Sequence, residues 1–129
     1  MSDTSTLSVG VDVVDGGVPT THRFISTFND FVDAGCDEFV TQIVQADITT
    51  GVDLDFSAFA SVTALIVKNR DAAHFVTMTY DDVVGGGATI ALVIPAGGFV
   101  VVGDVDPAVA VNLTADTAAC YCDVFIQGS

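Results

Sequence analysis

Residues 62–102 read VTALIVKNRDAAHFVTMTYDDVVGGGATIALVIPAGGFVVV, and this stretch decides the expected fold. It holds four short runs rich in Val, Ile, Thr and Phe, separated by segments that contain Asp, Gly or Pro. Such runs bounded by turn residues are typical of β-strands. We therefore predict four consecutive strands, at Val62–Asn69, Phe75–Tyr80, Thr89–Ile94 and Phe99–Val102.

The same pattern continues on both sides of this stretch. In Thr6–Val14 (TLSVGVDVV) apolar residues alternate with Ser, Gly and Asp, the period of two expected of a half-buried strand. Only Asn29–Gly35 (NDFVDAG) favours a helical turn, with Asn29 or Asp30 as its cap. The further predicted strands are Thr21–Phe28, Phe39–Ala46, Val52–Phe56, Val109–Leu113 and Ala119–Gln127.

About ten short strands at eight- to twelve-residue spacing are typical of a sandwich, jelly roll or barrel. A chain of 129 residues is the usual size of one domain, and no linker or repeat divides it. We therefore predict an all-β fold, a single jelly-roll-like β-sandwich of about 8–10 short antiparallel strands over residues 1–129. The N-terminal segment is expected to serve as an arm that contacts neighbouring subunits.

Charge excludes some functions. Seventeen acidic residues face three basic ones, Arg23, Lys68 and Arg70, which gives a net charge of −14. Three basic residues cannot form the patch that phosphates require, so we expect no nucleic-acid partner. Sixteen of the acids are Asp and one is Glu38. The Asp excess fits turn residues, a protein adapted to high salt in a halophilic host, or a divalent-cation site.

The sequence lacks common metal-binding, hydrolase and phosphate-binding motifs. His22 and His74 do not form a His-x-His pair or an HExxH motif, and no GxSxG segment occurs. The run Gly85–Gly87 lacks the Lys-Ser/Thr of a phosphate loop. We therefore expect no enzyme, no catalytic residue and no cofactor.

Cysteines and acidic pairs give the remaining site candidates. Cys120 and Cys122 lie at i and i+2 of a predicted strand, so they should share its buried face as free thiols. Cys36 stands alone. The weak candidates for a divalent-cation site are four carboxylates: Asp53 and Asp55 in a DLD segment that would place both on one strand face, and the adjacent Asp81 and Asp82.

The segment from Val52 to the C-terminus resembles a pattern common in small virion proteins of tailed phages and related viruses. There a strand ending in "IKN-x-D-x-x-N-F/Y-V" precedes a "Pro/Ala-Gly" strand and an Ala-rich strand pair. The matching residues here are Val67, Lys68, Asn69, Asp71, Phe75 and Val76, then Pro95, Ala96 and Gly97, and finally Asn112, Thr114 and Ala115. His74 stands where the pattern has Asn.

The resemblance implies a jelly-roll-like domain that decorates a capsid as a cement protein, or that sits at a vertex or in the tail. The expected partners are further copies of the chain, in a trimer, and the major capsid protein or another virion protein. The expected location is the capsid surface of a virion assembled in the host cytoplasm. No uncharged apolar run is long enough to span a membrane, so no membrane partner is expected.

Two further expectations concern particular residues. Asn69 and Asp71, after Lys68, end a predicted strand and can bond local backbone groups, so this motif should form a corner of the fold.

The alternative function is a receptor- or carbohydrate-binding module of a tail or turret. Tyr80, with Asp81 and Asp82, is the best candidate for the binding loop of such a module.

Overall fold

The computed structural model describes residues 6–15, 18–29, 38–81, 88–103 and 105–129. Ten strands account for its regular structure, and the described ranges contain no helix that could cross a membrane. The strands are β1 (Thr6–Asp15), β2 (Val18–Asn29), β3 (Glu38–Ala46), β4 (Val52–Asp53), β5 (Val62–Asn69), β6 (Val76–Asp81), β7 (Thr89–Ile94), β8 (Phe99–Val102), β9 (Asn112–Ala115) and β10 (Cys120–Gly128). Of the predicted helical turn over 29–35, only Asn29 lies within the described residues, where it ends β2. Cys36 lies outside the described residues.

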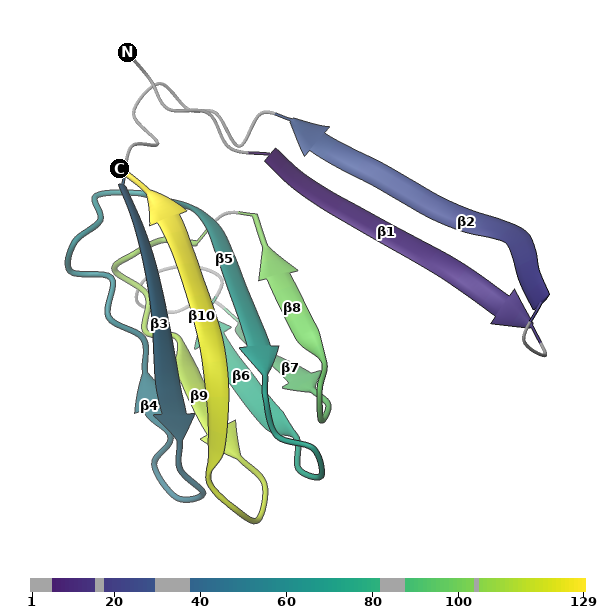
Figure 1. Ribbon diagram of the computed structural model, residues 1–129. Coiled ribbons are helices and arrows are strands. Elements are labelled where there is room, and N and C mark those ends of the chain that lie inside the picture. The colour runs from purple at the N-terminus through teal and green to yellow at the C-terminus, as the bar shows by residue number, and fades with distance from the viewer. Residues whose placement is uncertain (1–5, 16–17, 30–37, 82–87, 104) are drawn as a thin grey trace.

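Strands β3 to β10 form a β-sandwich of two four-stranded antiparallel sheets (Figure 1). One sheet has the order β3-β10-β5-β8 and the other β4-β9-β6-β7. This confirms the all-β sandwich predicted from the strand pattern. Among these eight strands, only β6 and β7 follow each other within one sheet, and every other connection between successive strands passes to the opposite sheet.

The pairing is nested along the chain. Strand β6 pairs with β7, β5 with β8, β4 with β9 and β3 with β10. The eight strands therefore behave as one long hairpin that is rolled up so that its halves divide between two sheets. This is the arrangement of a double-sheet jelly roll.

Three strands differ from their predicted bounds by more than one residue. Strand β2 begins at Val18 and not at the predicted Thr21, and β4 and β9 also differ. Hydrogen bonding explains the shortening of β4. Strand β4 stops at Asp53, although VDLDF continues the alternating pattern to Phe56. Leu54 N–H still bonds to the Val111 carbonyl, but Asp55 then accepts the Ser57 N–H at 2.9 Å and turns the chain.

Strand β9 starts at Asn112, three residues later than the predicted Val109. Pro107 has no N–H to offer a neighbouring strand, and the Val109 N–H bonds back to the Asp106 carbonyl at 3.0 Å. The apolar residues of this segment are buried without being strand residues, Val109 at 6% exposure and Val111 at 0%.

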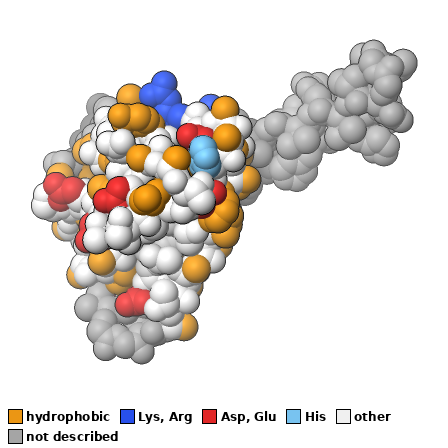
Figure 2. Space-filling view, turned by 90° about the horizontal axis from the view of Figure 1, so that it is seen from below, with side chains coloured by type: hydrophobic (Ala, Val, Ile, Leu, Met, Phe, Trp, Pro, Cys, Tyr) orange, Lys and Arg blue, Asp and Glu red, His pale blue; other side chains and the backbone are white. Residues whose placement is uncertain are grey.

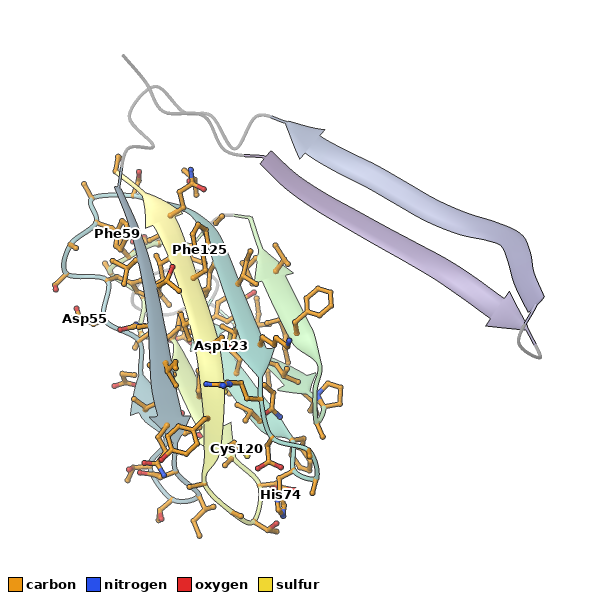
Figure 3. All side chains as sticks on the ribbon, viewed as in Figure 1. Asp55, Phe59, His74, Cys120, Asp123 and Phe125 are labelled. Carbon is orange, nitrogen blue, oxygen red and sulfur yellow. The ribbon has the colours of Figure 1, made fainter. Side chains whose placement is uncertain are left out.

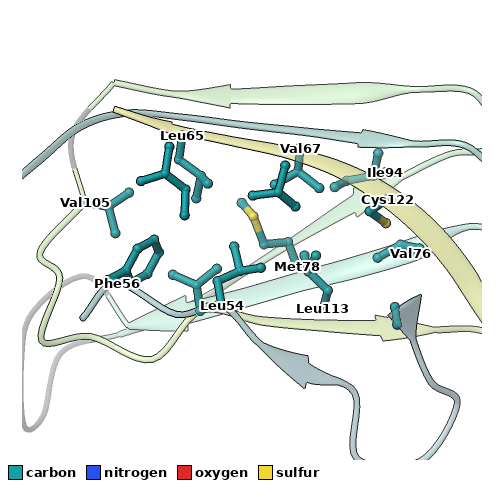
Figure 4. Close-up of a cluster of buried hydrophobic side chains, with 14 of the residues drawn as sticks. Leu54, Phe56, Leu65, Val67, Val76, Met78, Ile94, Val105, Leu113 and Cys122 are labelled. Atoms are coloured by element: carbon teal, nitrogen blue, oxygen red, sulfur yellow. The ribbon is translucent and has the colours of Figure 1, made fainter. Parts of the chain in front are cut away.

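The core lies between the two sheets, where apolar side chains from alternate strand positions meet. In β10 the inward residues are Cys120, Cys122, Val124 and Ile126, all fully buried. Figure 4 shows Met78 of β6 reaching from one sheet toward the strands of the other. The alternation predicted for β10 is thus the alternation between core and outer face.

Strands β1 and β2 make a separate two-stranded ribbon that precedes the sandwich (Figure 1). Their register sets Leu7 opposite Phe28, Val9 opposite Ser26 and Val11 opposite Phe24, with a shift between Asp12 and Val14. Within the described chain, each of these strands is hydrogen-bonded in a sheet only with the other.

Candidate functional site

The side of the β3-β10-β5-β8 sheet that faces away from the core is the main candidate surface, here called the outer face. Its position follows from strand register, because residues directly opposite each other project to the same side. One row across the sheet joins Thr41, Phe125, Ile66 and Val101, and the next joins Ile43, Asp123, Lys68 and Phe99.

Apolar side chains dominate this outer face. Ile43 and Phe99 are each 60% exposed and Tyr121 is 55% exposed, while Phe125 and Ile66 are partly buried between them. A sheet with one face toward water usually alternates apolar inward residues with polar outward ones. Asp123 and Lys68 separate Ile43 from Phe99 in their row, whereas the row of Phe125, Ile66 and Val101 is apolar throughout. Apolar side chains gathered on one exposed sheet face are typical of an interaction surface.

Two of the three basic residues of the chain also belong to this surface. Lys68 occupies an outer-face position of β5, and Arg70 follows the end of that strand. The Arg70 Nε atom lies 3.7 Å from the Oδ2 atom of Asp123, which is on the neighbouring strand β10. Figure 3 labels Asp123 on that strand. Because both side chains are about half exposed, this ion pair orients them but adds little stability.

The space-filling view, which looks at the sandwich from below the view of Figure 1, shows where charged side chains lie on that end (Figure 2). Lys and Arg side chains lie together at one edge, among hydrophobic side chains, whereas acidic side chains are spread over the rest of this view. The outer face is therefore less negative than the remainder of a strongly acidic molecule.

Next to the outer face, the motif Lys68-Asn69-Arg70-Asp71 turns the chain from β5 toward β6. Asn69 is fully buried. Its Nδ2 group donates to the carbonyls of His74 at 2.8 Å and of Ile94 and Pro95 at 3.3 Å, and its Oδ1 accepts the Asp71 N–H at 3.0 Å. The Asn69 side chain thus connects the end of β5 to the end of β7 and to the loop between β5 and β6.

Asp71 holds the next part of the same corner. Its Oδ1 accepts the N–H groups of Ala73 at 2.8 Å and His74 at 2.7 Å, and the His74 Nδ1 lies 3.1 Å away. These hydrogen bonds, led by that from Ala73, lower the pKa of the Asp71 carboxyl below its ordinary value of 3.8. Arg70, Asp71 and Tyr121 line a hollow of about 320 Å³ beside this corner.

The proposed cation ligands Asp53 and Asp55 line one open hollow of about 440 Å³ at the margin of the sandwich. Asp53 Oδ1 accepts a 2.9 Å hydrogen bond from Asn112 Nδ2, and Asp55 Oδ1 is engaged by the Ser57 N–H. The hydrogen bonds of Ser57 lower the pKa of the Asp55 carboxyl. Asp55 lies beyond the end of β4, so the two carboxylates do not share a strand as expected.

The second acidic pair is described only in part. Asp81 accepts a 2.8 Å hydrogen bond from the Thr89 hydroxyl across the β6–β7 pair, while Asp82 lies outside the described residues. Tyr80 is partly buried and packs against the core. Within the described ranges, no three His, Cys, Asp or Glu side chains gather as a metal site would require.

Both described cysteines are free thiols and are fully buried, as the strand alternation predicts. Burial raises the pKa of the Cys122 thiol to about 11 and also raises that of Cys120. Burial therefore disfavours the thiolate form that nucleophilic chemistry uses.

Sequence reasoning did not identify the outer face, although one signal was available. The run Ala64–Val67 (ALIV) is apolar at four consecutive positions, so two of its residues must project from each side of any strand. Ala64 and Ile66 are the two on the outer side, and Phe125 and Val101 extend the row of Ile66 across the sheet.

The chain matches no known family model, no curated protein and no solved structure.

Proposed function

We propose that this chain is a non-enzymatic structural protein of a virus particle. It decorates the capsid surface as a cement protein, associating with copies of itself and with the major capsid protein, after assembly in the host cytoplasm. The observation that carries this proposal is the apolar outer face, on which Ile43, Phe99 and Tyr121 are more than half exposed. A surface of that character is suited to burial against another protein.

The nested strand order adds support at the level of the fold. Double-sheet jelly rolls serve as viral capsid domains, lectins and cupins. Cupin chemistry requires a cluster of metal-binding histidines, whereas His74 bonds to Asp71 at the fold corner and His22 lies in β2 of the separate ribbon. Because one fold hosts many functions, the surface carries more weight than this analogy.

Charge points to the kind of partner. A molecule with a net charge of −14 repels other acidic proteins but is attracted to a basic surface. The shell protein that it covers should therefore present Lys and Arg where the acidic loops approach it. Lys68 and Arg70 reduce the repulsion where two copies of this chain meet.

Immunogold electron microscopy of purified virus particles tests the proposal, with antibodies raised against the recombinant chain. Gold on the capsid surface, together with peptides of the chain in the particle fraction by mass spectrometry, is the expected result. If mass spectrometry finds the chain in infected cells but never in particles, a virion role is ruled out.

A carbohydrate- or receptor-binding module remains the second candidate, and one observation favours it. Tyr121 presents an exposed ring beside Arg70 and Asp71 at a hollow of about 320 Å³. This aromatic and polar group is better exposed for a sugar than the partly buried Tyr80. Gold confined to tail tips, with glycan-array binding lost in Tyr121→Ala, would support this function in place of the capsid role.

A further inference from the structure

Strand β3 is the longest edge strand of the sandwich. It has nine residues, while the other edge strands β4, β7 and β8 have two, six and four. Figure 1 shows β3 at one margin of its sheet. Its register with β10 runs from Glu38 to Ala46 without a bulge. A long and regular edge is a template on which a further strand can pair.

Hydrogen bonds within the sheet show which backbone groups of β3 face this edge. The Tyr121 carbonyl accepts the Arg70 N–H at 2.9 Å, so the backbone groups of Tyr121 point toward β5 and away from β3. Backbone groups alternate in direction along a strand, so those of Cys122 point toward β3, where its partner is Val44. Val44 and every second residue from it therefore bond to β10, and the residues between them direct their N–H and C=O groups to the free edge.

The residues that face the free edge include Thr41, Ile43 and Gln45. Within the described part of the chain, the backbone of β3 makes no hydrogen bond outside its ladder with β10. Val40 and Val44 pack against the core but stay partly exposed, whereas the inward residues of β10 are fully buried. The lateral side of β3 is therefore open to a further strand.

The composition of this edge favours a second copy as that strand. Natural edge strands are commonly blocked by Lys, by Pro or by a bulge, and Phe39–Ala46 contains no proline and no charged residue. Two copies that each carry a net charge of −14 repel one another over most of their surfaces. An uncharged edge is a place where the two copies can approach.

We propose that β3 of one copy pairs antiparallel with β3 of a second copy about a two-fold axis at Gln42. A two-fold contact requires a surface that is complementary to itself. In this register Thr41 lies opposite Ile43 of the second copy, and each residue offers the other its N–H and C=O groups. Val40 lies opposite Val44 of the second copy, which covers the part of each valine that is exposed in one copy.

The contact joins the two outer faces into one surface, with four strands from each copy. It also covers part of Ile43, which is 60% exposed in a single copy. This inference deepens the self-association included in the proposed function and rests on it. A two-fold contact gives a dimer, whereas the resemblance to virion proteins implies a trimer, so the mass of the assembly separates the two.

Proline at position 41 tests the pairing in the full chain. The Thr41 N–H faces the free edge, so Thr41→Pro removes a hydrogen bond to the second copy and none to β10. Light scattering after size exclusion should show a dissociation constant raised about tenfold or more. Thr41→Ala keeps the N–H and should retain the wild-type dimer. If circular dichroism shows Thr41→Pro to be unfolded, Ile43→Asp replaces it, because it places a like charge from each copy at the contact.

A cysteine at position 42 tests the register. The axis sets this residue opposite itself in a non-hydrogen-bonded pair, with Cα atoms about 4.5 Å apart, which is within the range of a disulfide. Gln42→Cys in a Cys36→Ser background should cross-link, with diamide as oxidant, at least about tenfold faster than Tyr121→Cys, an exposed control on β10. The thiols of Cys120 and Cys122 are buried and should not compete.

Four results would overturn the inference. They are a monomeric wild-type chain at both about 0.15 M and about 2 M NaCl, a trimeric mass, a folded Thr41→Pro chain that keeps the wild-type dimer, and equal cross-linking of the two cysteine variants. A monomer would leave this edge to a strand of another protein. Immunogold labelling reports location and not mass, so loss of the virion role and loss of this contact are separate outcomes.

Discussion

The Nδ2 group of Asn69 and the carbonyl oxygen of His74 form a 2.8 Å hydrogen bond that spans the corner between β5 and β6. Asn69 is fully buried, and the same group reaches the carbonyls of Ile94 and Pro95. The side chain therefore bonds main-chain groups of two segments, of which Ile94 is buried and His74 and Pro95 lie nearer the surface.

Asn69→Ala is expected to lower the free energy of unfolding by about 2–3 kcal/mol, because it removes the hydrogen bonds of a buried amide to the carbonyls of His74 and Ile94 and to the Asp71 N–H. Urea denaturation measures the change. Lys68→Ala alters the exposed neighbour in the same strand and should stay within about 0.5 kcal/mol of the wild type. Equal stabilities for the two variants would show that the corner does not depend on the Asn69 amide.

Alanine substitutions at two glycines with similar positive φ angles should separate the conformational cost of a substitution from its packing cost. Gly51 has φ of 69° and Gly97 has φ of 70°. A Cβ atom at Gly51 would lie 2.5 Å from both Asn112 Oδ1 and the Leu113 carbonyl oxygen, whereas a Cβ at Gly97 meets nothing within 4 Å. Gly97→Ala should therefore cost about 1 kcal/mol, and Gly51→Ala more than about 2 kcal/mol, in chemical denaturation.

Acid should destabilise the sandwich partly through Asp71. Its folded-state pKa is lowered below 3.8, so its contribution to stability is present above the unfolded pKa and is lost as pH falls through the folded value. The unfolding free energy should decline below about pH 4, and the decline should be shallower in Asp71→Asn. Superimposable pH profiles for the variant and the wild type would exclude this role.

High salt should raise the melting temperature. With a net charge of −14, self-repulsion in the folded state is strong at low ionic strength and is screened within a few ångströms at molar salt. The test is a melting series in NaCl, since sulfate would also strengthen apolar burial. A flat response would reject adaptation to a halophilic host.

The thiols of Cys120 and Cys122 should resist alkylation until the protein unfolds. Both are fully buried, and the pKa of Cys122 is raised to about 11, so little thiolate is available near neutral pH. Mass spectrometry of the peptide that contains both residues, after iodoacetamide treatment with and without denaturant, measures this. Rapid labelling in the folded state would contradict their burial.

Much of the fold was predictable because the strands carry their own signal. The bounds of β5, β7 and β8 agree with the sequence pattern, since turn residues flank each run. The shortened β4 and late β9 were not predictable, because Leu54 and Val111 are buried by the tertiary fold and not by membership of a strand.

The candidate surface was less accessible to sequence reasoning than the fold. Ile43, Phe99 and Tyr121 lie on different strands that become neighbours only through the β3-β10-β5-β8 order. Periodicity assigns an apolar residue to a strand but cannot say whether the second apolar face meets a core, a partner or water. The hydrogen bonds from Asn69 to Ile94 and Pro95 could not be predicted either, because they depend on the end of β7, which is distant from Asn69 in the sequence.

Nested pairing also determines the order in which this chain can acquire its structure. During synthesis β3 leaves the ribosome early, yet its partner in the sheet is β10, which also lies between β3 and β5. The β3-β10-β5-β8 sheet therefore cannot be completed before β10 has been synthesised, and β3 stays without its sheet neighbour and open to aggregation in that interval. The ribbon of β1 and β2 needs only local contacts, so it can form while the rest of the chain is still being made.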